Sequence, residues 1–184
     1  SDGEYSASAN VSLSVSAVND APVLATVSDV SFDEDGSGST SLSANDVDGD
    51  SLEFSISGGD QITASLSGSD ISFSAPANFN GSEEFTVSVN DGEYTDSQNI
   101  TVTVLAVNDA PVAQDINIEI IEDETIVIQL LGSDVDVGTT LTYEIVTSVS
   151  NGILNVDGGL VTYSPNADYN GSDSFTYEVT DGFL

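Results

Sequence analysis

The 184-residue chain contains no lysine, arginine or histidine, whereas aspartate and glutamate together number 32. No ion pair can form between its side chains, so each carboxylate relies on water, a hydrogen-bond donor or a bound cation. Two carboxylates about 4 Å apart repel each other by roughly 4 kcal/mol at an effective dielectric constant near 20. A folded chain that gathers its acids in clusters is therefore expected to hold cations there.

Cysteine, methionine and tryptophan are also absent. The lack of cysteine and histidine excludes disulfides, zinc–thiolate centres and Ser-His or Cys-His catalytic arrangements. The lack of lysine and arginine excludes a basic patch for nucleic acid or anionic lipid. No run of about 18 apolar residues exists, so we expect no membrane insertion. Ser1 opens no signal peptide, and we therefore expect an internal piece of a longer chain.

The chain does contain an internal repeat. The hexapeptide Val-Asn-Asp-Ala-Pro-Val at 18–23 recurs unchanged at 107–112, a spacing of 107 − 18 = 89 residues. Further blocks recur in the same order, namely 34–35 with 122–123, 46–48 with 134–136, 79–82 with 169–172, and 89–92 with 179–182. Residues 2–5 also resemble 91–94. The repeat predicts that 1–18 are the last strand of a preceding repeat, 19–107 a first repeat, and 108–184 a second repeat lacking its last strand.

Apolar residues alternate with Ser, Thr and Glu at period two, as in Val11, Leu13 and Val15, and no segment has a convincing helical period. About seven strands per repeat are typical of an immunoglobulin-like sandwich. The fold class predicted is all-β, with tandem immunoglobulin-like Greek-key β-sandwiches. The expected strands are 22–32, 37–43, 51–57, 61–67, 70–75, 83–90 and 94–106, then 112–121, 124–131, 139–147, 152–156, 160–164 and 173–180.

The acids fall mainly in the loops between these strands, and alternate loops lie at opposite poles of a sandwich. Asp46, Asp48, Asp50 and Asp91 are expected to meet at the pole where the chain enters the first repeat. The candidate ligands there are Asn19, Asp20, Asp46, Asp48 and Asp91; those expected around the junction of the two repeats are Glu34, Asp35, Asn108, Asp109, Asp134, Asp136 and Asp181.

Calcium (Ca2+) fits this set of ligands, because it takes about six to eight oxygens from carboxylates, amide side chains and carbonyls. Magnesium demands a stricter octahedral geometry, and transition metals prefer histidine or cysteine. An ordinary role remains open as well, since Asp, Asn and Gly are common turn formers.

The residues at 107–112 resemble the inter-repeat linker of cadherins, Asp134-Val135-Asp136 their Asp-x-Asp loop, and Glu34 their base glutamate. The chain resembles still more closely the cadherin-like tandem repeats of large bacterial adhesins and secreted surface proteins. The resemblance implies calcium at the junctions, a rod-like array of neighbouring repeats, and an extracellular place at the bacterial cell surface. The Asp-Arg-Glu loop of animal cadherins is absent, and residues 78–81 take its place.

We therefore expect calcium-rigidified extender repeats of a bacterial adhesin, which serve spacing and cell adhesion and have no catalytic residues. The alternative is a carbohydrate- or protein-binding module of an adhesin or secreted hydrolase, because tyrosines such as Tyr5, Tyr94 and Tyr169 can stack on sugars. A two-carboxylate glycosidase is chemically possible. However, the acids sit in repeated loops rather than in one special cleft.

Residues 5–17 have the pattern of a last strand, whereas the second repeat lacks one. An unpaired sheet edge recruits strands. We therefore predict that 5–17 of one molecule complete the second repeat of a neighbour, head to tail.

Overall fold

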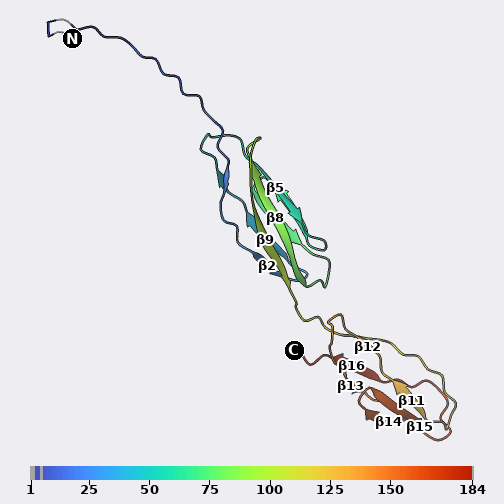
Figure 1. Ribbon diagram of the computed structural model, residues 1–184. Coiled ribbons are helices and arrows are strands. Elements are labelled where there is room, and N and C mark those ends of the chain that lie inside the picture. The colour runs from blue at the N-terminus through green and yellow to red at the C-terminus, as the bar shows by residue number, and fades with distance from the viewer. Residues whose placement is uncertain (1–2, 5, 184) are drawn as a thin grey trace. The chain divides into compact units, whose positions relative to one another are not determined.

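A computed structural model describes residues 3–4 and 6–183, and the chain divides into two compact units, residues 1–106 and 107–184. The described residues form 16 β-strands and no helix (Figure 1), which confirms the all-β prediction. Accordingly, no helix in this part of the chain has the length and apolarity needed to cross a bilayer. Ser1, Asp2, Tyr5 and Leu184, which fall in the predicted segments 1–18, 5–17 and 108–184, lie outside the described residues.

The first unit is a sandwich of two sheets, in which the first long strand pairs with the last one in parallel and the other pairs are antiparallel. One sheet has the order β2 (Val30–Asp33), β9 (Thr95–Leu105), β8 (Gly81–Asn90) and β5 (Glu53–Gly58). The other has the order β3 (Ser37–Ser41), β7 (Asp70–Ser74) and β6 (Thr63–Ser67). A short ribbon joins β1 (Val23–Leu24) to β4 (Ala44–Asn45).

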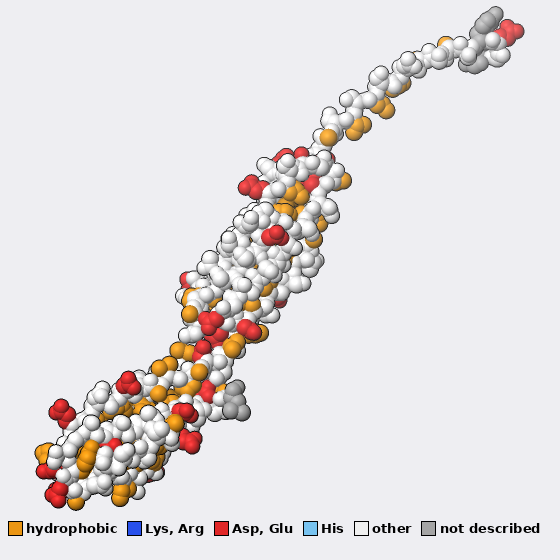
Figure 2. Space-filling model, turned by 180° about the vertical axis from the view of Figure 1, so that it is seen from behind, with side chains coloured by type: hydrophobic (Ala, Val, Ile, Leu, Met, Phe, Trp, Pro, Cys, Tyr) orange, Lys and Arg blue, Asp and Glu red, His pale blue; other side chains and the backbone are white. Residues whose placement is uncertain are grey.

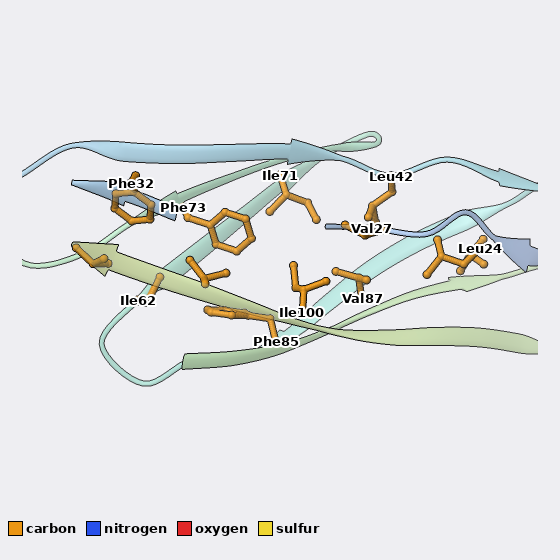
Figure 3. Packing of buried hydrophobic residues seen from close by; sticks show 13 residues of the cluster. Leu24, Val27, Phe32, Leu42, Ile62, Ile71, Phe73, Phe85, Val87 and Ile100 are labelled. Atoms are coloured by element: carbon orange, nitrogen blue, oxygen red, sulfur yellow. The ribbon is translucent and has the colours of Figure 1, made fainter. Parts of the chain in front are cut away.

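The core of the first unit lies between these two sheets, where 13 hydrophobic residues are buried (Figure 3). The rings of Phe73 and Phe85, one from each sheet, meet edge to face with centroids 5.3 Å apart. β9 contributes Ile100, Val102 and Val104, all at most 2% exposed. The alternation read from the sequence thus marks the buried face of the strand.

The second unit has smaller sheets, with orders β11-β15-β14, β13-β16 and β10-β12. Its strands are β10 (Val112–Ala113), β11 (Ile126–Gln129), β12 (Gly132–Ser133), β13 (Thr142–Thr147), β14 (Gly152–Asp157), β15 (Leu160–Pro165) and β16 (Thr176–Thr180). Ile128, Leu130 and Val161 are the buried residues of its core cluster among the described residues. This core is far smaller than that of the first unit.

The first predicted strand of each repeat differs from the structure. The strand expected at 22–32 is divided into β1 and β2, because side chains replace the strand ladder between them. Asp96 accepts the Leu24 amide at 2.8 Å, and Gln98 bonds the Val27 amide and carbonyl at 3.2 and 2.6 Å.

In the second unit the strand predicted at 112–121 is wrong beyond 113, and the strand predicted at 173–180 begins only at 176. In the first unit the corresponding strands, β2 and β8, both pair with β9. In the described part of the second unit, no strand occupies the corresponding place beside β16.

Candidate functional site

The loop between β4 and β5 folds around the carboxylate of Asp46. Its Oδ1 atom accepts the backbone N–H groups of Asp48, Gly49 and Asp50 at 2.9, 3.0 and 3.4 Å. Asp46, Asp48 and Asp50 each place a carboxylate oxygen within 4.8 Å of the other two. This turn brings three negative charges together.

Asn19 and Asp20 connect the same loop with the turn between β8 and β9. The Asp20 backbone N–H donates to Asp48 Oδ2 at 2.7 Å, and Asn19 Nδ2 donates to Asp91 Oδ2 at 2.9 Å. The backbone N–H groups of Tyr94 and Glu93 donate to Asp91 Oδ1 and, with the Asn19 amide, hold the pKa of Asp91 below its usual value. The structure therefore brings together residues 19–20, 46–50 and 91, which we call the first acidic pole.

The second unit repeats this arrangement with its own residues. Asp134 Oδ1 accepts the Asp136 backbone N–H at 2.8 Å, and Asp136 Oδ2 accepts that of Asp109 at 2.8 Å. The position that corresponds to Asp50 is Gly138, so this loop has one carboxylate fewer.

Asp181 occupies the position in the second unit that Asp91 has in the first. Its Oδ2 atom accepts the Asn108 side-chain amide at 2.6 Å, and Oδ1 accepts the Phe183 backbone N–H at 2.9 Å. The Asn108 amide, followed by the Phe183 N–H, keeps the pKa of Asp181 below its usual value. Residues 108–109, 134–136 and 181 are called the second acidic pole.

One oxygen in each pole has no protein partner. Asp46 Oδ2 and Asp134 Oδ2 are both shielded from solvent, and no donor among the described residues reaches either atom. A buried polar atom left unsatisfied costs about 1–3 kcal/mol, and more if it is charged. Figure 2 shows acidic side chains along the visible face with no basic side chain beside them, in keeping with the composition. An oxygen-seeking cation such as calcium satisfies such an atom, and the triad Asp46, Asp48 and Asp50 of the first pole has the carboxylate spacing that can hold one.

Glu34 and Asp35 lie at the opposite end of the first sandwich. The Glu34 backbone N–H donates to the Leu105 carbonyl at the end of β9, and only 6% of Glu34 is exposed. Asp35 has φ of 59° and accepts the Asn78 backbone N–H at 3.2 Å, so it fixes two loops to each other. That Glu34 and Asp35 bind metal stays a prediction.

Sequence reasoning missed a carboxylate that organises another turn of the first unit. Glu83 accepts the backbone N–H groups of Asp60, Gln61 and Ile62 at 2.8, 2.9 and 3.0 Å. Burial opposes ionisation, but the N–H groups of Gln61, Asp60 and Ile62 outweigh it and lower the pKa of Glu83.

Asp173 does the same in the second unit. It accepts the backbone N–H groups of Ser150 and Asn151 at 3.0 and 2.8 Å and the Tyr163 hydroxyl at 3.1 Å. Burial again opposes ionisation, and these donors together with the Ser174 N–H lower the pKa of Asp173. The signal in the sequence is that an acid follows Asn-Gly-Ser in both repeats.

Tyr169, one of the tyrosines considered for stacking on sugars, donates its hydroxyl to the Ser172 carbonyl at 2.8 Å. Tyr143, Tyr163 and Tyr177 pack against the core cluster of the second unit, and the Tyr177 hydroxyl donates to the Leu131 carbonyl at 2.8 Å. Tyr94 is 44% exposed. Tyr5 lies outside the described residues.

Two tandem β-sandwiches of the immunoglobulin type, each with an acidic pole, define the class of this chain. The sequence matches the family described as bacterial Ig domain over residues 19–103 and 108–183, and the chain belongs to that family. Domains of this family and fold are typically non-catalytic.

Solved structures share the fold at low sequence identity. Form II of human protocadherin-24 EC1-2 has a TM-score of 0.58 at 19% identity, with 88% of this chain and 95% of that one covered. Human protocadherin-24 EC1-2 gives 0.51 at 17%, with 89% and 94% covered. Drosophila N-cadherin EC1-4 gives 0.51 at 11%, with 88% and 48% covered. A comparison with curated proteins gave no match. The resemblance to cadherin-like and Ig-like tandem repeats of bacterial surface proteins is thus confirmed.

Proposed function

We propose that this chain is a pair of calcium-binding extender repeats of an extracellular bacterial adhesin, with a role in spacing and cell adhesion. The observation that carries the proposal is the orphaned oxygen found in both poles, Asp46 Oδ2 and Asp134 Oδ2. In both loops the Oδ1 atom of the same aspartate accepts the backbone N–H of the residue two positions later, although the two loops share only part of their sequence. A turn-forming role explains the bonded Oδ1 atoms, whereas it leaves the Oδ2 atoms without a partner.

Calcium at the first pole is held by Asp46, Asp48 and Asp50, with Asn19 and Asp91 beside them. Asn19 Nδ2 donates to Asp91, which leaves the oxygen of the same amide as an acceptor. The affinity expected for an extracellular module is about 10⁻⁴–10⁻³ M, which suits a surface bathed in millimolar calcium.

At the second pole the ligands are Asp134 and Asp136, with Asn108, Asp109 and Asp181 beside them. The ion neutralises the repulsion between the carboxylates of the loop. Because Asp109 already donates its backbone N–H to Asp136, neutralising this loop also fixes the linker residues 108–109 to the second unit. Calcium therefore stiffens the linker, which is the property that a spacer needs.

Calorimetric titration of the chain with calcium chloride tests the sites. We expect heat from at least one ion in each unit, loss of the first site in Asp46→Asn, and loss of the second in Asp134→Asn. Asp70→Asn is the matched control, because Asp70 is exposed at the start of β7 and outside both poles. Absence of calcium heat in the unmodified chain, together with identical melting in calcium and in chelator, would overturn the proposal.

Small-angle scattering tests the spacer role separately. We expect the maximum dimension and the flexibility of the chain to change when a chelator removes calcium. Calcium binding without any change in scattering would support the proposed sites and contradict the proposed spacer role. A glycan array with the same protein tests the alternative, since specific glycan binding favours a carbohydrate-binding module.

A further inference from the structure

The chain enters the first unit beside the strand by which it leaves. We call residues 19–34 the entry segment and residues 91–105 the exit segment. The two run parallel, because β2 of the entry segment pairs with β9 of the exit segment in parallel register (Figure 1). Both segments lie within the first unit, which is described from residue 6 to its last residue.

Bonds between the two segments recur at a nearly constant offset along the sequence. The bonded pairs are 19–91, 24–96, 27–98 and 29–101, followed by the four ladder pairs from 30–102 to 33–105. The partners in the first four pairs are 71 or 72 residues apart, and the ladder keeps the same offset, since 102 − 30 = 72. The Glu34 N–H closes the far end by donating to the Leu105 carbonyl at 2.9 Å. The two segments are therefore fastened to each other from residue 19 to residue 34.

Side chains make the first half of these bonds, and the main chain makes the second half. Asp96 accepts the Leu24 N–H, and Gln98 both accepts from the Val27 N–H and donates to the Val27 carbonyl, as a neighbouring strand would. These bonds are partly buried, and Leu24 and Val27 are only 9% and 7% exposed. A hydrogen bond in such a place is stronger than one in water, because the local dielectric constant is lower.

Tension along the chain pulls these two segments past each other. It acts on the entry segment at residue 19 and on the exit segment at residue 105, which lie at opposite ends of the parallel pair. In this shear geometry the bonds share the load instead of breaking one at a time. Sliding would also draw Ile100, Val102 and Val104, all at most 2% exposed, out of the core, which costs free energy as apolar surface meets water.

We propose that the entry and exit segments form a shear clamp that lets the first unit bear tension, and that Asp96 and Gln98 supply the bonds of its side-chain half. The proposal deepens the spacer role proposed above, on which it rests, because a spacer that bears load must keep its fold under tension. Without Asp96 and Gln98 the entry segment is joined to the exit segment only at residue 19 and from residue 29 onward.

The direction of pulling can be chosen, because the chain has no cysteine of its own. Handles on Ser16→Cys and Ala106→Cys, both at exposed positions, load the clamp in shear and leave the second unit outside the loaded path. Handles on Ser37→Cys and Ala106→Cys load the β2–β9 pair from one end, so that its bonds break in turn. Lifetimes at constant force report the unfolding rate, and we expect the first unit to survive about tenfold longer or more in shear.

Variants test the side-chain half of the clamp. Gln98→Ala removes both bonds to the Val27 main chain, so its lifetime in shear should be about tenfold shorter, and Asp96→Ala, which removes one bond, should shorten it about fivefold. Asn99→Ala is the matched control, because Asn99 lies on the same strand but bonds Thr86 of β8 at 3.0 Å. Its lifetime in shear should follow that of the unmodified chain.

The two pulling directions separate a clamp from general stability. A residue that only stabilises the fold would shorten the lifetime by the same factor in both directions, whereas we expect the loss in Gln98→Ala to be confined to shear. If Gln98→Ala does not fold, Gln98→Glu, which keeps the acceptor for the Val27 N–H, is measured in its place and should give a smaller loss with the same direction dependence.

Equal lifetimes of the unmodified unit in the two directions would overturn the proposal, and so would equal losses in Gln98→Ala and Asn99→Ala. Calorimetric titration with calcium uses the same chain without force. Calcium binding by a unit that shows no resistance in shear would therefore contradict the clamp alone, and resistance in shear without calcium binding would contradict the calcium sites alone.

Discussion

Replacement of Asp46 by asparagine is expected to change stability in opposite directions with and without calcium. Asparagine keeps an Oδ1 acceptor for the turn, which Asp46 forms with three backbone N–H groups. It removes the charge at the oxygen that has no partner. If Asp46 only forms the turn, this substitution should therefore have one result, and if Asp46 also binds calcium, it should have another.

The size of the stability change expected in chelator follows from the geometry of the loop. Asp46 faces two carboxylates within 4.8 Å. Each pair at that distance repels by about 1 kcal/mol under the full aqueous screening that suits the exposed Asp48 and Asp50, and by more where burial of Asp46 Oδ2 reduces that screening. Loss of both repulsions, less the weakening of the charge-assisted turn bonds, leaves a gain of about 1 kcal/mol in chelator. For a domain of this size that is about 4–8 °C in melting temperature.

In the presence of calcium we expect Asp46→Asn to lower stability instead of raising it. With a dissociation constant of about 10⁻⁴–10⁻³ M, calcium at about 10 mM stabilises the unmodified unit by about 1.4–2.7 kcal/mol. Asp46→Asn loses this gain, so it should melt above the unmodified chain in chelator and below it in calcium. Calorimetric melting of both proteins in both buffers is the assay, with Asp70→Asn alongside to measure the general effect of lost charge. An equal shift in the two buffers would refute the argument.

Three further outcomes are expected. Glu83 and Asp173 have pKa values below their ordinary 4.5 and 3.8. Their contribution to stability is therefore present above those values and is lost as pH falls through the lower pKa values of the folded state. In Glu83→Gln and Asp173→Asn the melting temperature should depend less on pH in this acid range. Gly59→Ala should destabilise the first unit in chemical denaturation, because φ is +75° and a Cβ atom would lie 2.5 Å from a carbonyl oxygen and a phenylalanine ring. Asp35→Val should cost about 1–3 kcal/mol in the same assay, since a branched side chain is strained at φ of 59° and the bond from the Asn78 amide is lost, whereas Asp35→Asn should cost little.

Much of the fold followed from the sequence because its signals are local. Period-two alternation identifies buried faces, as the burial of Ile100, Val102 and Val104 confirms. Repeated blocks located the loops whose residues the structure brings together, including Asn19 with Asp91 and Asn108 with Asp181. The sequence also led us to expect the acids of the first loop near one another, and the structure groups Asp46, Asp48 and Asp50.

The failures concern interactions between distant residues. The strand predicted at 112–121 had the right alternation, but a strand also needs a partner strand, and among the described residues no strand pairs with 114–121. The division of 22–32 depends on Asp96 and Gln98, about 70 residues away along the chain. Composition showed that every acid needs a partner, whereas only coordinates show that Glu83 uses backbone N–H groups.

The second loop has Gly138 at the position of Asp50, and under the proposed calcium binding this difference would affect how an array of such repeats responds to its surroundings. Calcium affinity rises with the number of charged ligands, so the first pole should fill at a lower concentration than the second. As calcium falls, linkers of unequal composition would soften one after another rather than all at once. The flexibility of the array would then vary from linker to linker. The calcium concentration at which each linker softens would depend on a single residue in one short turn.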